Sequence, residues 1–100
     1  MRRLDFEAVS RAALSALPAI LRRWLPDGHL RGSEYIARNP RRADRHEGSF
    51  RINIRSGKWC DFATNDKGGD VVSLAAYLAG SSQIEAARNL SRMLGLDAND

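Results

Sequence analysis

The chain has 100 residues, 43% of them hydrophobic, and its 16 Lys and Arg against 12 Asp and Glu give a formal net charge of +4. A chain of this length builds one small core, so we expect a single domain over residues 1–100. One cysteine excludes an intramolecular disulfide framework, and neither a charged-then-apolar leader nor an apolar run of membrane-spanning length is present. We therefore expect a cytoplasmic protein that does not contact a membrane.

The basic charge is concentrated in the middle of the chain. Residues 1–30 carry a net charge of +2, residues 31–67 carry +4 and residues 68–100 carry −2. Fourteen of the 16 basic residues are arginine, whose planar guanidinium binds phosphate oxygens two at a time and stacks on bases. This distribution suits nucleic-acid binding, and it is also compatible with a surface that is only solvated.

The first predicted element is a helical extension over residues 1–25. Asp5 is placed to cap it, and apolar residues at helical spacing follow in "FEAVSRAALSAL". Pro18 then interrupts the pattern, which predicts either a kink or two short helices, the second ending at Trp24. "PDG" at 26–28 is a turn signal, in which the glycine tolerates a positive φ.

The middle of the chain has the period of β-strands. "SEYIAR" (33–38) and "SFRINI" (49–54) alternate apolar and polar residues, and the pattern continues in "SGKWCDF" across a turn at Ser56-Gly57. Residues 49–55 and 58–62 therefore form a predicted antiparallel hairpin. Alternation places Phe50, Ile52 and Ile54 on one side of it and Arg51, Asn53 and Arg55 on the other, and it separates Trp59 and Asp61 from Cys60 and Phe62.

Two helices complete the chain. Asp70 caps "VVSLAAYLA", which ends at Gly80. Ser82 and Glu85 form a capping box for a second helix, which Gly95 ends. The predicted fold class is α+β: a small antiparallel sheet packed with one N-terminal helix, kinked or split, and two C-terminal helices.

One stretch carries a family resemblance. "NPRRADRHEGSFRINIRSGKWCDFATNDKGGDVVSLAAYLAG" resembles, in order and spacing, the N-terminal zinc-ribbon domain of bacterial and phage DNA primases, and more closely that of primase-helicase proteins. The matching landmarks are Asn39-Pro40-Arg41-Arg42, Gly48-Ser49-Phe50, Trp59 and Gly68-Gly69-Asp70. The resemblance covers residues 33–95 and implies a metal-binding ribbon that contacts the DNA template.

The zinc ligands of that family are missing from this chain. Structural zinc takes four ligands, usually in two close pairs, but Asn39 and Arg42 stand where the first pair is implied, and Cys60 and Asp61 are near the second. The other candidate ligands, His29 and His46, are not spaced as pairs. We therefore expect no metal and no cofactor.

Packing and hydrogen bonds must then replace the metal. We expect apolar area from Trp59 and Phe62, with the N-terminal helix covering the sheet. We also expect hydrogen bonds from Asp61 and Thr64 to loop N–H groups, and positive φ angles at Gly68-Gly69.

The resemblance and the charge together predict a nucleic-acid-binding module. Its partner is expected to be single-stranded DNA, with a primase or helicase as a further partner, in the replication of a phage or mobile element. Trp59 or Tyr35 is available for base stacking, although Trp59 also suits the core. The expected binding residues are Arg38, Arg41, Arg42, Arg45, Arg51, Arg55, Lys58, Trp59 and Lys67.

No catalytic constellation is visible, so we expect an accessory domain and not an enzyme. Cys60 has no flanking histidine, and Asp61, Asp66 and Asp70 are interpreted as turn and cap residues. "KGGD" lacks the full phosphate-loop spacing and is better explained as a turn that starts a helix. The rival hypotheses are a protein-interaction module docking on a replication or mobilisation protein, and a remnant without activity. The choice between DNA and RNA stays open.

Overall fold

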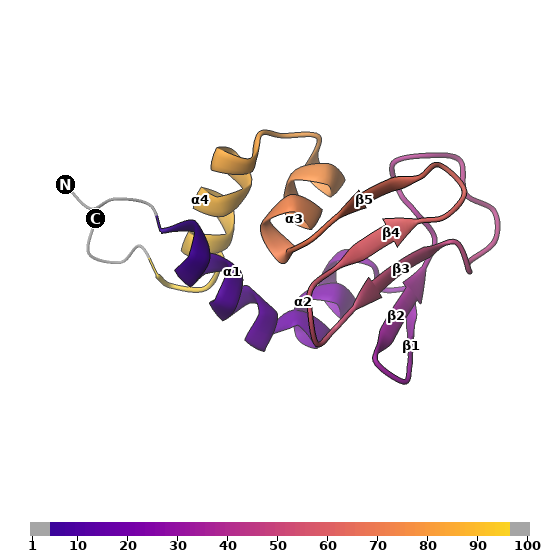
Figure 1. The fold of residues 1–100 in the computed structure, drawn as a ribbon, viewed down its shortest axis with the longest axis horizontal. Helices are drawn as coiled ribbons and strands as arrows, with labels where there is room; N and C mark the ends of the chain where they lie inside the picture. The colour runs from indigo at the N-terminus through magenta and orange to yellow at the C-terminus, as the bar shows by residue number, and fades with distance from the viewer. Residues whose placement is uncertain (1–4, 97–100) are drawn as a thin grey trace.

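The structure, a computed structural model, describes residues 5–96, and within them it has the predicted α+β architecture. Two helices precede a five-stranded sheet and two follow it (Figure 1). The elements are α1 (Phe6–Ser15), α2 (Leu17–Trp24), β1 (His29–Arg31), β2 (Glu34–Ala37), β3 (Phe50–Asn53), β4 (Trp59–Asp61), β5 (Asp66–Gly68), α3 (Val71–Ala79) and α4 (Gln83–Met93).

The N-terminal helical segment is split, which was one of the two predicted alternatives. The Asp5 carboxylate accepts a 3.0 Å hydrogen bond from the Ala8 N–H and caps α1. Pro18 lies in the first turn of α2, where a missing N–H removes no helical hydrogen bond. The proline therefore starts the second helix and does not merely bend the first.

The C-terminal helices begin at the predicted N-caps, Asp70 and Ser82. Asp70 and Ser73 form a reciprocal capping box at the start of α3, and Gly80 follows its end at φ 66°. At α4, the Ser82 hydroxyl accepts a 3.1 Å hydrogen bond from the Glu85 N–H. None of the helices within residues 5–96 has the length and apolar character needed to cross a membrane.

The sheet is an antiparallel meander in the order β1-β2-β3-β4-β5. The three central strands were predicted, whereas the two edge strands were missed. The edge strands "HLR" and "DKG" are three residues long and mostly exposed, so they lack the apolar alternation that marks a strand in sequence. Backbone pairing with a neighbouring strand creates them.

Register divides the sheet into two faces. Tyr35, Ile52 and Trp59 are paired across β2, β3 and β4 and point into the core, which we call the inner face. The prediction that Asp61 shares a face with Trp59, and not with Cys60 and Phe62, is also confirmed, because the Asp61 side chain is fully buried. Phe62 points the other way and is 67% exposed, so its predicted core role is wrong.

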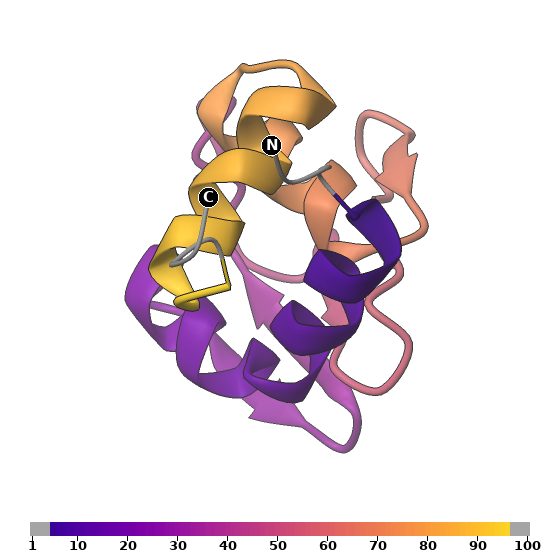
Figure 2. The ribbon, with the colours of Figure 1, turned by 90° about the vertical axis from the view of Figure 1, so that its left-hand side faces the viewer.

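The helices cover only the inner face. Figure 1 shows α2 behind the strands, and the Tyr35 hydroxyl donates a 2.7 Å hydrogen bond to the Leu25 carbonyl that follows this helix. On α3, the Tyr77 ring lies 4.7 Å from the Trp59 ring, centroid to centroid. Figure 2 shows α1 beside α3 and α4, which it contacts. The expectation that the whole N-terminal segment covers the sheet is therefore corrected: the α2 half reaches it, and α1 packs on the other helices.

The predicted role of three glycines, to adopt positive φ angles, is also corrected. Gly28, Gly68 and Gly69 do not have positive φ angles. A Cβ on Gly28 would overlap the Tyr35 ring, and a Cβ on Gly68 would overlap the Trp59 indole and the Ser73 hydroxyl. Gly28 and Gly68 are therefore needed for close approach and not for backbone conformation.

This close approach gives a testable prediction. Gly68→Ala is expected to lower the free energy of unfolding by about 1–3 kcal/mol, because the added methyl group must displace the buried Trp59 indole. Urea denaturation measures the change. Gly69→Ala is the matched control, since a Cβ there meets no atom within 4 Å. Equal effects of the two substitutions would contradict the steric explanation.

Candidate nucleic-acid interface

A buried polar cluster occupies the position where the primase resemblance implies a metal. Asn39 and Arg42 belong to the long loop between β2 and β3, and both contact Asp61 at the end of β4. The Asp61 carboxylate accepts a 2.8 Å hydrogen bond from the Asn39 amide and bonds of 2.7 and 3.2 Å from Nε and Nη2 of Arg42. We call Asn39, Arg42 and Asp61 the polar clasp. It joins the loop to the sheet.

The clasp keeps Asp61 ionised although the side chain is 0% exposed. Burial by itself raises the pKa of this carboxyl. Hydrogen bonds from Arg42, from Asn39 and from the Ala63 N–H outweigh burial and hold the pKa of Asp61 well below its usual range. The Ala63 bond is 2.9 Å long and starts the turn that follows β4, as predicted for this carboxylate.

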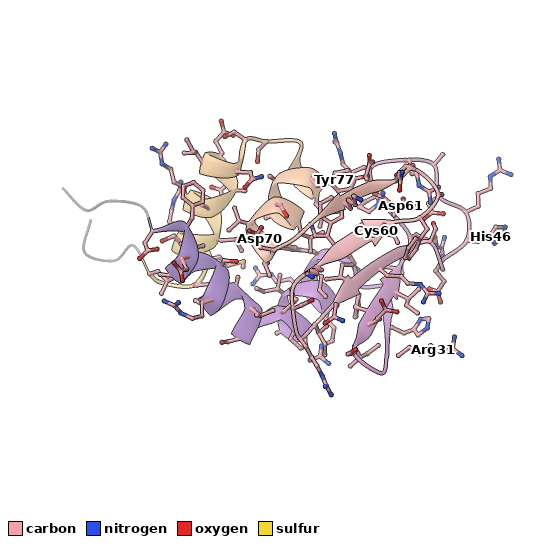
Figure 3. The ribbon with its side chains drawn as sticks, viewed as in Figure 1. Arg31, His46, Cys60, Asp61, Asp70 and Tyr77 are labelled. Atoms are coloured by element: carbon pink, nitrogen blue, oxygen red, sulfur yellow. The ribbon has the colours of Figure 1, made fainter. Side chains whose placement is uncertain are left out.

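Further hydrogen bonds extend from the clasp to α3 and β5. The Asn39 amide also donates to the Tyr77 hydroxyl at 2.8 Å, and that hydroxyl donates to Asp66 at 2.7 Å. Asp44 accepts from the Asn39 N–H at 2.8 Å. Figure 3 shows Asp61 and Tyr77 close together where β4 and β5 meet α3. Within the described residues, every buried side-chain nitrogen and oxygen has a hydrogen-bond partner.

These residues do not fit a zinc ion. Both oxygens of Asp61 already accept hydrogen bonds, and the cation beside them is the guanidinium of Arg42. Cys60, adjacent in sequence, lies on the other face of the sheet. Across residues 5–96 no three His, Cys, Asp or Glu side chains converge on a point where a metal could bind. The hydrogen-bonded ion pair connects the segments that the resemblance would join through metal ligands.

The predicted basic residues separate into different environments. Arg42 is held inward by Asp61, and it also donates to the Ser49 hydroxyl at 2.7 Å. Arg41 lies at the end of α3, since a Cβ on Gly80 would be 3.2 Å from both of its Nη atoms. The expectation that Arg42 binds phosphate is corrected, because its guanidinium is paired with Asp61. The predicted residues that remain exposed are Arg38, Arg41, Arg45, Arg55, Lys58 and Lys67.

The predicted stacking residues are not available to a base. Trp59 is 5% exposed, its indole N–H donates to the Ser73 hydroxyl at 3.0 Å, and its ring packs on Tyr77 and Phe50. Tyr35 is buried, with its hydroxyl bound to the Leu25 carbonyl. Trp59 is therefore withdrawn from the binding residues and assigned to the core.

The outer face of the sheet is partly covered by the long loop. His29, Ile36, Arg51, Cys60 and Lys67 form one row across the five strands on this face. Glu47 is 2.9 Å from His29 Nδ1, and the Gly48 carbonyl accepts a 2.8 Å hydrogen bond from Arg51 Nε. The loop thus crosses the face near β1 to β3, where Ile36 is buried.

The remaining part of the outer face is uncovered and basic. Arg51 is 37% exposed and its Nη1 is 3.2 Å from Glu34 Oε1. Lys58 and Lys67 are exposed, and Lys58 lies opposite Asn53, whose N–H donates to its carbonyl at 2.8 Å. We call this surface the open strand face and define it by Arg51, Lys58, Cys60, Phe62 and Lys67.

Sequence reasoning missed three features of the site. The polar clasp was not predicted as a unit, although alternation does place Asp61 on the Trp59 face of the strand. The same alternation places Phe62 on the face opposite Trp59, and the structure shows that the Phe62 face is the exposed one. Arg31 was not considered, and it lies opposite Glu34 on the outer face, at the edge strand far from the clasp (Figure 3). No sequence signal marks Arg31, because β1 has no apolar alternation.

Comparison with known proteins adds no relative: neither a protein-family model nor a curated protein sequence matches this chain.

Proposed function

We propose that this chain is a nucleic-acid-binding module that binds single-stranded DNA on the open strand face. It would act as an accessory domain in phage or mobile-element replication, beside a primase or helicase, and would not itself catalyse a reaction. The resemblance to the primase zinc ribbon supports this role. In this proposal the polar clasp stabilises the loop in place of a structural zinc ion. The observation that carries the proposal is the basic, helix-free outer face.

The charges of this face suit a polyanion. Lys58 and Lys67 are exposed, and no ion pair of either is found in the described residues. Arg51 forms an ion pair with Glu34, and both side chains remain partly exposed. An exposed ion pair contributes at most about 1 kcal/mol, so a phosphate can compete with Glu34 for this arginine. Three cations on adjacent strands could then contact successive phosphates of one strand.

The test is a fluorescence-anisotropy titration of a labelled single-stranded oligonucleotide at about 50 mM and about 200 mM salt. We expect binding that weakens with salt, because each phosphate contact with a single strand contributes about 0.7 to the slope of log affinity against log salt. The K58Q/K67Q double variant should bind more weakly and lower the slope by about 1.4. Zinc assayed on the same sample should be far below one equivalent.

The matched control is Arg88→Gln, which removes an exposed charge from α4 and leaves the strands unchanged. It should bind like the unmodified protein. Absence of binding at the lower salt concentration would overturn the proposal. An effect of R88Q half as large as that of the double lysine variant, in proportion to the charges removed, would show that only net charge matters and would contradict a site on the open strand face.

The second candidate function is a protein-interaction module. The observation that favours it is an apolar groove of about 380 Å³ between α2, α3 and α4, lined by Trp24, Leu78, Leu90 and Met93 among others. A docking surface with an apolar centre is less sensitive to salt than phosphate contacts are. Salt-insensitive association with a replication protein, combined with no DNA binding, would favour this candidate over the first.

A further inference from the structure

Phe62 is a large aromatic side chain that the fold leaves in solvent. It follows β4 directly and is 67% exposed, whereas Phe50 and Trp59 of the same hairpin are buried. Burying a phenylalanine side chain stabilises a fold by about 1.5–3 kcal/mol, so an aromatic ring that the core does not use is open to a role in binding. A single exposed apolar residue is common on protein surfaces and does not by itself indicate a binding site. The residues around Phe62 are therefore the evidence for or against a binding role.

The surroundings of Phe62 are basic and ordered. Its N–H donates a 2.8 Å hydrogen bond to the Ser49 carbonyl, so it continues the pairing of β3 with β4. Asp61 is buried and Phe62, one residue later, is exposed, as expected if the alternation of β4 continues and places Phe62 on the side of Cys60. Arg51 on β3 is its diagonal neighbour, and diagonal neighbours on adjacent strands lie about 7–8 Å apart. Lys67, on the other side of Cys60, completes this group of charges.

The turn that carries Phe62 is held in place by Asp61. The Asp61 carbonyl accepts a 2.7 Å hydrogen bond from the Asn65 N–H, and its carboxylate accepts one from the Ala63 N–H. The same carboxylate is fixed by the polar clasp. The backbone of Phe62 is therefore held in place before any ligand arrives, which lowers the entropic cost of binding.

We propose that Phe62 is a stacking platform for an unpaired nucleobase, with Arg51 and Lys67 contacting the phosphates beside it. The inference rests on the proposed function and specifies its ligand as single-stranded nucleic acid with accessible bases. An aromatic ring stacks on the face of any base, so the contact tolerates different sequences. In a duplex both faces of each base are covered by neighbouring bases, so the same contact selects against double strands.

The experiment measures affinity for a labelled single-stranded oligonucleotide, for the matching duplex and for an oligonucleotide of abasic sugars with the same number of phosphates. Phe62→Ala should weaken single-strand binding about tenfold, because stacking on one aromatic contributes about 1–3 kcal/mol per base. Its salt slope should stay unchanged, since no phosphate contact is lost. Phe62→Trp should restore the affinity. Phe6→Ala, at a 40% exposed phenylalanine on α1, is the matched control and should have no effect.

The outcomes separate this inference from the proposed function. Salt-dependent single-strand binding that F62A leaves unchanged would overturn the stacking role alone. Binding of the abasic oligonucleotide as tight as that of the normal one would do the same. Absence of any binding by the unmodified protein would overturn both proposals. Circular dichroism should show F62A as folded as the unmodified protein, and failure of F62W to recover binding would assign the loss to the fold and contradict the inference.

Discussion

Replacement of Asp61 with alanine is expected to lower the free energy of unfolding by about 3–5 kcal/mol. The substitution removes an acceptor that takes hydrogen bonds from Asn39, Arg42 and the Ala63 N–H. It leaves the buried Asn39 amide with one partner fewer and the Arg42 guanidinium with no partner in β4. Domains of this size have a stability of about 5–15 kcal/mol, so the variant should be marginally folded. Urea denaturation followed by circular dichroism measures the change.

The matched control for this prediction is Asp66→Ala on the neighbouring strand. Asp66 is exposed and accepts one hydrogen bond, from the Tyr77 hydroxyl. Its loss should cost about 1 kcal/mol, the typical contribution of one hydrogen bond. If D61A were as stable as D66A, the polar clasp would not be the interaction that holds the loop to the sheet.

Stability should also fall in acid because of the same carboxylate. The pKa of Asp61 is held well below its usual range in the folded protein, whereas in the unfolded chain it is about 4. Below pH 4 the unfolded state therefore binds more protons, and acid favours unfolding. The contribution of Asp61 is fully present above pH 4 and is lost, at up to about 1.4 kcal/mol per pH unit, as pH falls toward the folded pKa.

Asp61→Asn isolates this effect, because the amide has the shape of the carboxylate and does not titrate in this range. The free energy of unfolding, measured by urea denaturation between about pH 2.5 and about pH 6, should fall more steeply below pH 4 in the unmodified protein than in D61N. Parallel curves for the two proteins would show that Asp61 titrates alike in both states. The hydrogen bonds of the clasp would then have no net preference for the ionised form.

The polar clasp joins two segments that are distant in the sequence. The loop before β3 and the end of β4 meet through Asn39, Arg42 and Asp61. An ion pair of this kind has directional requirements that a hydrophobic contact lacks, so we expect it to fix the position of the loop as well as to stabilise it.

The clasp also accounts for the distribution of the loop arginines. Arg42 is directed inward by Asp61, and Arg41 lies at the end of α3. From the sequence alone, both arginines are predicted to bind phosphate. The surface proposed for DNA is instead formed by outward-facing residues of β3 to β5 and of the segments next to β4, because the helices leave this side of the sheet uncovered (Figure 1).

Much of the fold could be predicted from local sequence signals. Asp5, Asp70 and Ser82 mark helix starts by a side-chain acceptor that any isolated helix would use. Alternation in "SFRINI" and "SGKWCDF" determined which residues face the core, since the period of a strand is two. These features depend on residues only a few positions apart, and they therefore appear in the sequence itself.

The sequence by itself thus determined the α+β class, an interruption of the first helix at Pro18, the central hairpin and the basic character of the middle of the chain. Only the tertiary structure decided that β1 and β5 exist, that Asn39 and Arg42 meet Asp61, and that Phe62 and not Trp59 is exposed. Those outcomes depend on contacts between residues distant in the chain and on which face of the sheet the helices cover. Local pattern specifies a face, and packing decides which face becomes the core.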